Sequence, residues 1–208
     1  MNKLNTVSGG RLIIFEGIDG IGKTTQLKLA ESYLKEQCYK VKATRNLGGT
    51  PIGEELRQVI IKPIKRPPLT DLFISMAIQE ALLGEVEKLR RQGSIILMDR
   101  SPIAMVAYQA YGSGLNKAQC WKFADKGMKS LRPELTLYLS GDIAASLARA
   151  KVASGKADYF ESKPETYFKA VNKGYEAAAK RYQVVTINAD RSIEAVHFDI
   201  TNKISQII

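Results

Sequence analysis

The sequence has few cysteines, which disulfide frameworks and thiolate metal sites need, and only one histidine. Among 208 residues there are two cysteines, Cys38 and Cys120, and they form no CxxC pair. This pattern argues against a disulfide-stapled secreted scaffold and against a cysteine-based metal site. The only histidine, His197, falls in the last amphipathic stretch of the chain. We therefore expect His197 to be structural or exposed rather than catalytic.

The sequence also shows no signal peptide and no apolar run long enough to span a membrane. Together with the scarcity of cysteine, this predicts a soluble protein of the reducing cytoplasm with no membrane partner. The formal net charge is +10, which suits a protein that handles polyanions. No aromatic-interleaved basic block or helix-turn-helix pattern accompanies that charge, so nucleotide phosphates are favoured over nucleic acid as the ligand.

The clearest motif that the chain does contain is the glycine-rich segment GIDGIGKT at residues 17–24, which follows the apolar run LIIF. A helical pattern begins inside the motif, so strand, loop and helix arrive in the order that a phosphate-binding loop requires. The backbone N–H groups of such a loop and the positive end of its helix converge on phosphate oxygens. The plain alternative is a glycine-rich turn with a surface lysine.

Under the functional interpretation this loop binds ATP. Lys23 reaches the β- and γ-phosphates and Thr24 contacts Mg²⁺. The predicted phosphate-binding residues are consecutive in the sequence: Gly17, Ile18, Asp19, Gly20, Ile21, Gly22, Lys23, Thr24 and Thr25.

Apolar runs alternate with amphipathic stretches along the rest of the chain. We predict strands at residues 12–16, 40–44, 94–99, 135–139 and 183–187. We predict helices at residues 23–37, 52–60, 69–91, 103–111, 117–131, 142–153, 164–182 and 192–206. This alternation is typical of an α/β fold in which helices cover both faces of a five-stranded parallel sheet. The length favours a single domain over residues 1–208.

A second candidate site is Asp99-Arg100, directly after the apolar run IILM. Ligands of open parallel sheets gather beyond the carboxyl ends of the strands, so this pair should lie near the glycine-rich loop. Asp99 could hold Mg²⁺ through water, and Arg100 could bind a second phosphate bidentately. The alternative is a helix-capping acid beside a solvated arginine.

Several motifs in the same order and spacing resemble the thymidylate kinase family. They are FEGIDG at residues 15–20, KTTQ at 23–26, TR at 44–45 with GGT at 48–50, DR at 99–100, AYQ at 107–109 and RPELTLYL at 132–139. The resemblance extends from about residue 12 to residue 190. It implies a P-loop NTPase fold of three layers with a helical lid, transfer of the ATP γ-phosphate to dTMP to give dTDP, and a homodimer.

The resemblance also implies roles for residues outside the glycine-rich loop. On the acceptor side, Asp19 contacts the sugar 3′-hydroxyl and Arg45 and Arg100 contact the phosphate. Phe73 stacks on the base, while Tyr108 and Gln109 line the deoxyribose and base pocket. The plain alternative is that Phe73 and Tyr108 are core aromatics.

On the donor side, the resemblance places Arg149 against adenine and Ala189 in the loop that borders it. The lid spans about residues 151–161, where Lys151 and Lys156 are the candidate cations. The resemblance implies that five residues take part in catalysis: Lys23, Asp99, Arg100, Lys151 and Lys156. Arg149 could equally be a solvated helix charge.

The chain also departs from the family pattern. Asn46-Leu47 replaces Glu-Pro, and Ala77 replaces the arginine expected one helical turn after Phe73. The lid region is poor in arginine, with Tyr159 after Asp158, and Ile21 stands where some relatives place an arginine. Two alternatives therefore remain open: a kinase of another nucleoside monophosphate, and a nucleotide-binding homologue with weak or no turnover.

Overall fold

A computed structural model describes residues 5–154 and 163–208. Five strands form one parallel sheet in the order β2-β3-β1-β4-β5. The strands are β1 (Arg11–Glu16), β2 (Val41–Arg45), β3 (Ile95–Asp99), β4 (Leu135–Ser140) and β5 (Val185–Asn188). The helices are α1 (Lys23–Glu36), α2 (Pro51–Ile61), α3 (Pro68–Arg91), α4 (Pro102–Met105), η1 (Val106–Gly112), α5 (Lys117–Leu131), α6 (Ile143–Ser154), α7 (Glu165–Arg181) and α8 (Ile193–Ile204).

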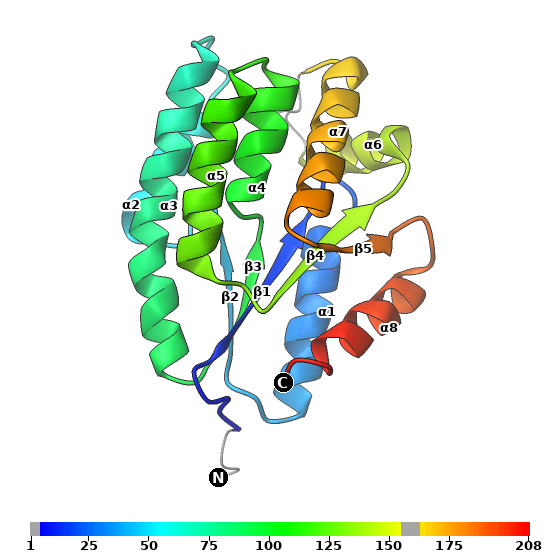
Figure 1. Cartoon of the computed structure of the whole chain (residues 1–208). Helices are drawn as coiled ribbons and strands as arrows, with labels where there is room; N and C mark the ends of the chain where they lie inside the picture. Colours follow the sequence, from blue (N-terminus) through cyan, green and yellow to red (C-terminus); the bar gives the residue numbers. More distant parts are fainter. Residues whose placement is uncertain (1–4, 155–162) are drawn as a thin grey trace.

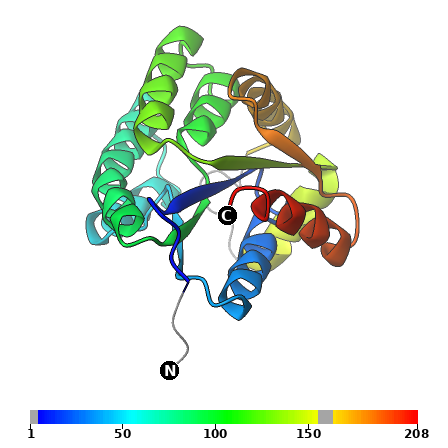
Figure 2. The ribbon, with the colours of Figure 1, turned by 60° about the horizontal axis from the view of Figure 1, so that its bottom comes forward.

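Helices cover both faces of the sheet, as predicted. Figure 2 shows α1 and α8 on one side of the strands, and α3, η1 and α5 on the other. The three central strands, β1, β3 and β4, are almost entirely buried. Their continuous apolar sequences follow from burial on both faces, because a parallel sheet has no solvated side.

The predicted strands and most predicted helices are confirmed to within a few residues at their ends. The strand expected at 183–187 begins later, at Val185, because Gln183 adopts a left-handed backbone conformation with φ of 52°. Such a residue cannot continue a strand and instead forms the turn after α7. The proline-rich segment at residues 62–68 is predicted to contain no helix because of its three prolines. Residues 62–67 do connect α2 to α3 without a helix, and the third proline, Pro68, is the first residue of α3.

The predicted helix at 103–111 is confirmed in position, but it is not a single α-helix. The structure has one short α-helical turn, α4, followed by the π-helix η1. Ser101 starts this unit by accepting a hydrogen bond from the Ile103 N–H at 3.1 Å. Helix α7 then packs so closely on η1 that a Cβ on Gly174 would lie 2.6 Å from Ala107 Cα. The π-helix thus packs tightly against α7. π-helical turns of this kind often occur at functional sites.

The carboxyl ends of the strands meet at one edge of the sheet (Figure 1). Phe15 at the end of β1 lies opposite Asp99 in the register, and so does Arg45 at the end of β2. The loop after β1 and the Asp99-Arg100 pair are therefore neighbours. Within residues 5–154 and 163–208, no helix combines the length and apolar character that crossing a membrane requires.

Most of the predicted lid falls outside the described residues. Helix α6 ends at Ser154, and α7 begins at Glu165. Lys156 and Tyr159 lie between these two helices, in the part of the chain that the structure does not describe.

Candidate functional site

The glycine-rich loop is held in a conformation that residues with a side chain rarely adopt. Gly17, Gly20 and Gly22 have φ values of 138°, 75° and 108°. A Cβ on Gly20 would lie 1.9 Å from the Ser146 carbonyl oxygen of α6, so the loop passes directly under that helix. Gly22 occupies the N-cap position of α1 and leaves the N-terminal amides of the helix without a side-chain cap. An anion can therefore use those amides.

Lys23 occupies the centre of the loop and is 5% exposed. Its Nζ donates a hydrogen bond to the Ile18 carbonyl oxygen at 2.9 Å and lies 3.9 Å from Asp19 Oδ1. Burial and the nearby Arg100 guanidinium lower the pKa of Lys23, while the surrounding carboxylates oppose that shift. The ammonium is thus fixed and largely desolvated, which strengthens its attraction for a bound phosphate.

The loop borders a cavity of about 540 Å³. It is lined by Asp19, Gly20, Ile21, Gly22, Lys23, Thr24, Thr25, Gln26, Asp99, Arg149, Ala150, Ala189, Arg191, Ile193 and Val196. The predicted donor-side residues Arg149 and Ala189 are among them. Gly17 and Ile18 lie behind the lining residues, where Ile18 is buried and holds Lys23.

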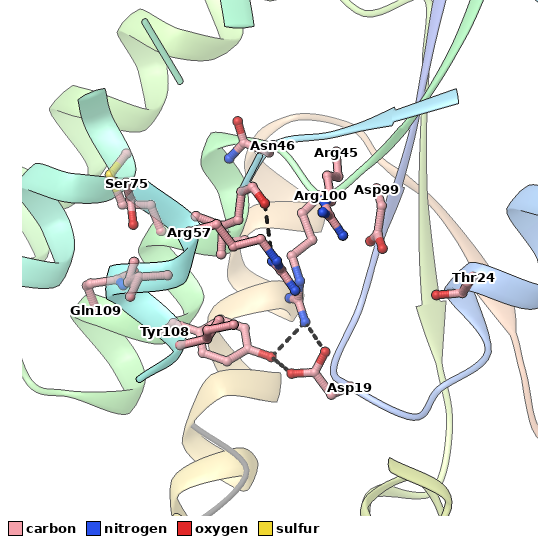
Figure 3. Close-up of a pocket in the computed structure, with 15 residues that line it drawn as sticks. Asp19, Thr24, Arg45, Asn46, Arg57, Ser75, Asp99, Arg100, Tyr108 and Gln109 are labelled. Atoms are coloured by element: carbon pink, nitrogen blue, oxygen red, sulfur yellow. Dashed lines mark hydrogen bonds and ion pairs between the residues drawn. The ribbon is translucent and has the colours of Figure 1, made fainter. Parts of the chain in front are cut away.

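A second cavity of about 260 Å³ lies on the other side of the strand ends (Figure 3). It is lined by Asp19, Thr24, Arg45, Asn46, Leu47, Arg57, Ile60, Ile61, Ser75, Asp99, Arg100, Ala104, Met105, Tyr108 and Gln109. Three residues, Asp19, Thr24 and Asp99, line both cavities. The two spaces therefore meet at a carboxylate and hydroxyl cluster beside the loop.

Arg100 is fixed by three partners in the second cavity and beside it. Its Nη2 donates to Asp19 Oδ1 at 2.6 Å and to the Tyr108 hydroxyl at 3.0 Å, and its Nη1 donates to the Tyr175 hydroxyl. The Tyr108 hydroxyl in turn donates to Asp19 Oδ2 at 2.9 Å. Burial opposes ionisation of Asp19, but Arg100 and Lys23 outweigh it and hold the pKa of that carboxyl well below its usual range.

Two more guanidinium groups line the second cavity. Arg45 pairs with Glu54, whose Oε1 also accepts a hydrogen bond from the Gly49 N–H at 2.8 Å. Arg57 donates to the Leu47 carbonyl oxygen at 3.1 Å. Three arginines around one small cavity, with planar forked donors, suit a phosphate group.

Phe73 is not brought into this cavity. It is 56% exposed on α3 and lines neither cavity, and Ala77, one helical turn later, is exposed as well. Ser75 from the same helix lines the cavity instead. Tyr108 and Gln109 do line it, both from η1, and both are more than nine-tenths buried. The alternative of Phe73 as a core aromatic is wrong, because its ring faces solvent.

Lys151 lies apart from both cavities. It lines a neighbouring cavity of about 320 Å³ between α6 and α7, which Asp19 also borders. His197 lies on α8, with its ring edge-on to Tyr33 at 6.1 Å between centroids, and it lines neither cavity.

The residues present fit a hydrated Mg²⁺ ion held mainly by phosphates. Asp99 Oδ1 is buried and has no hydrogen-bond partner among the described residues. Figure 3 shows the Thr24 hydroxyl and the Asp99 carboxylate on the same side of the site. Among the described residues no group of three or more His, Cys, Asp and Glu side chains could hold a metal by itself. Mg²⁺ in phosphoryl-transfer sites takes one or two protein ligands plus phosphates and water, which matches this donor set.

Glu16, at the end of β1, is a buried acid in the wall of the site. It is 1% exposed, accepts a hydrogen bond from the Ser101 hydroxyl at 2.5 Å, and has no described partner for Oε2. Burial raises the pKa of Glu16 from 4.5 to about 7, and the Ser101 hydrogen bond and nearby cations offset only part of this effect. Between pH 4.5 and about 7, Glu16 therefore keeps its proton in the folded protein and loses it in the unfolded chain.

We expect Glu16→Gln to remove a pH dependence of stability. Between pH 4.5 and about 7 the unfolded chain binds fewer protons than the folded protein, so the free energy of unfolding falls as the pH rises. The full loss is about 3 kcal/mol above pH 7. Urea unfolding should show that the stability of the variant relative to the parent chain is greater at pH 8.5 than at pH 4.5. Equal slopes against pH in the two proteins would contradict this assignment.

Sequence reasoning missed several residues that border the site. Arg57, Ser75 and Met105 line the second cavity, and Tyr175 holds Arg100 from behind. Arg57 lies one to two helical turns after the GGT motif, which is the one signal that could have marked it. Met105 and Tyr175 look like ordinary core residues in the sequence, and only the packing of η1 and α7 brings them here.

A phosphate-binding loop and an arginine-lined cavity that meet at shared acids, on a five-stranded parallel sheet, define a P-loop phosphotransferase. The family model described as Thymidylate kinase matches residues 15–200. The chain therefore belongs to the thymidylate kinase family, and the predicted fold is confirmed.

Individual relatives agree with this assignment. The thymidylate kinase of Alkalilimnicola ehrlichii is 33% identical over 192 residues, which cover 90% of this chain and 88% of that protein. That of Nitrosospira multiformis is 33% identical over 207 residues, with 95% and 98% covered. The crystal structure of thymidylate kinase from Ehrlichia chaffeensis matches with a TM-score of 0.76 at 26% identity, over 94% of this chain and 99% of that one.

Proposed function

We propose that this protein transfers the γ-phosphate of ATP to dTMP and releases dTDP and ADP. The observation that carries the proposal is the junction of the two cavities at Asp19, Thr24 and Asp99. A donor tail on the glycine-rich loop and an acceptor phosphate among the arginines would face each other there. Phosphoryl transfer through a loose transition state needs alignment and positive charge more than a strong base.

On the donor side, residues 17–25 would hold the triphosphate of ATP. Lys23 is the fixed cation for the β- and γ-phosphates, and Arg149 and Ala189 border the space for adenine. Thr24 and Asp99 would hold Mg²⁺, which neutralises charge on the phosphates when it is bound. Lys151 and Lys156, in a lid over about residues 151–161, are the further cations that we propose.

On the acceptor side, Arg45 and Arg100 would bind the monophosphate, with Arg57 as a third cation beside them. Asp19 stays ionised and can accept a hydrogen bond from the 3′-hydroxyl of the sugar. Tyr108 fills the space next to it, where a ribose 2′-hydroxyl would be crowded. Gln109 has a buried side-chain oxygen with no described partner and can donate or accept hydrogen bonds to the base.

A second candidate function has its own support. Neither Phe73 nor the position of Ala77 borders the acceptor cavity, so the cationic contact expected for the thymine carbonyl is absent from it. Losing a hydrogen bond to a charged group costs about 1.5–3 kcal/mol, which is enough to change the preferred base. The alternative is a kinase of another nucleoside monophosphate.

A coupled ADP-release assay across dTMP, dUMP, dCMP, dGMP and the ribonucleotides tests these proposals. We expect turnover with dTMP, and weaker turnover with every ribonucleotide because of Tyr108. A higher kcat/KM for a different base would replace dTMP with that acceptor. No ADP release with any of these acceptors, combined with tight ATP binding by calorimetry, would contradict both kinases and support a binding protein with little turnover.

We also propose that the protein forms a homodimer and is located in the cytoplasm. Large apolar side chains are exposed along α2, the connector and the start of α3: Ile52, Val59, Ile64, Leu69 and Phe73. A surface of this kind favours association, and a second copy of the chain is the simplest occupant. Light scattering coupled to size-exclusion chromatography should give twice the 23.0 kDa chain mass. A monomer at micromolar concentration would contradict the homodimer.

A further inference from the structure

Tyr175 is a rigidly held side chain in the wall of the site. It lies on α7 and is 1% exposed. Its ring stacks on Tyr138 at 5.6 Å between centroids and meets the edge of Tyr108 at 6.3 Å. Packing on two sides fixes the direction of the hydroxyl, because a buried ring in such contacts has little rotamer freedom.

That hydroxyl accepts a hydrogen bond from Arg100 Nη1. Burial raises the pKa of Tyr175 well above its ordinary value, although Arg100 opposes the shift, so the hydroxyl stays neutral. With Asp19 and Tyr108 on Nη2, three of the five N–H groups of Arg100 have described partners. Two N–H groups remain for a phosphate.

The three partners of Arg100 differ in where they lie. Asp19 and Tyr108 both line the acceptor cavity, so a bound nucleotide competes for their hydrogen bonds. Tyr175 lines neither the donor nor the acceptor cavity. It is therefore the one partner whose hydrogen bond the substrate does not reach.

The backbone of Arg100 cannot supply the same restraint. Arg100 lies in the turn between β3 and α4, with a φ of 65°. A left-handed conformation is unfavourable for a residue with a side chain and persists only where the surroundings enforce it. Neither a strand nor a helix sets the direction of its side chain.

We propose that Tyr175 is a positioning residue, which keeps the Arg100 guanidinium aimed at the acceptor phosphate when the nucleotide engages Asp19 and Tyr108. This inference rests on the proposed function of the same site. Tyr175 does not touch the reacting atoms and acts through Arg100.

The test is Tyr175→Phe, which removes the hydroxyl and keeps the stacked ring. A hydrogen bond to a charged group is lost, so we expect kcat/KM for dTMP to fall about tenfold or more. The KM for ATP should stay within about twofold, because the donor cavity is unchanged. Isothermal titration with dTMP alone should show a comparable loss of affinity.

Tyr138→Phe is the matched control. Tyr138 is 3% exposed, stacks on Tyr175, and donates its hydroxyl to Asn172 Oδ1 of α7 at 2.7 Å. The control removes a buried hydroxyl from the same ring pair without touching Arg100. We expect a similar change in Tm from both variants and a selective loss for dTMP only in Tyr175→Phe.

The outcomes separate this inference from the proposed function. If the parent chain turns over dTMP and the Tyr175→Phe and Tyr138→Phe variants have the same kcat/KM for dTMP, the proposed function stands and the role of Tyr175 is overturned. If the parent chain turns over no monophosphate, the proposed function fails, and dTMP titration decides the inference. Weaker dTMP binding by Tyr175→Phe, but not by Tyr138→Phe, would support the inference. Equal dTMP binding by the two variants, or no dTMP binding by the parent chain, would overturn it.

Discussion

Replacing Lys23 with methionine is expected to lower kcat by about two to three orders of magnitude, which is the usual effect of removing one preorganised stabilising group. The Lys23 ammonium is 5% exposed and is held by the Ile18 carbonyl oxygen. It therefore needs little reorganisation when charge develops on the transferring phosphoryl group. Methionine has a similar length and no charge, so the substitution isolates the electrostatic contribution.

The fold should tolerate this change. Asp19, the acid nearest Lys23, keeps its hydrogen bonds from Arg100 and Tyr108. We expect the circular dichroism spectrum to be preserved and the loss to appear in single-turnover rates measured at saturating nucleotide.

Lys28→Met is the matched control, because Lys28 is an exposed lysine on the same helix, α1. Its activity should equal that of the parent chain. A Lys23→Met protein that retains more than about a tenth of the parent turnover would show that the loop does not stabilise the transferring phosphoryl group in the way that we propose.

Arg100→Lys is expected to lower kcat/KM for the acceptor by about two orders of magnitude or more, with a much smaller effect on the KM for ATP. A lysine ammonium is a point charge and cannot reach Asp19, Tyr108, Tyr175 and a phosphate together, as the guanidinium can. The Arg100 side chain is 11% exposed, so water replaces few of the lost hydrogen bonds.

Arg132→Lys offers an unusually close control. Arg132 also has a left-handed backbone, with φ of 47°, and its Nη2 lies 2.6 Å from Glu87 Oε1. Its side chain is 66% exposed and lies at the end of α5, outside the residues that line either cavity. Kinetics unchanged in Arg132→Lys and reduced in Arg100→Lys would assign the effect to the site. An equal loss in both would show that the effect does not come from the contacts of Arg100 in the site.

Much of the site was predictable because its signals are local in the sequence. The glycine spacing at residues 17–24 requires positive φ values, and Gly17, Gly20 and Gly22 have them. The position of Asp99 and Arg100 followed from a general rule, since parallel strands end at one edge of the sheet. Tyr108 and Gln109 line the second cavity, and only the resemblance to a family indicated them as site residues.

Other features were not predictable, because they depend on contacts between distant segments. The helical periodicity of residues 103–111 predicts a helix, but it does not distinguish the α-helical turn α4 from the π-helix η1, on which α7 packs closely. The orientation of α3 likewise turns Phe73 to solvent and Ser75 to the cavity. A residue such as Tyr175 has no sequence pattern that separates a core aromatic from a partner of Arg100.

The sequence by itself determined the glycine-rich loop, the order of the strands and helices along the chain, and the family. Each of these depends on the spacing of neighbouring residues, which fixes the backbone conformation and the buried faces. Only the tertiary structure decided how the second cavity is built. Arg57, Tyr108, Arg100 and Tyr175 come from four different segments, and their contacts exist because helices packed on the sheet fix the direction of each side chain.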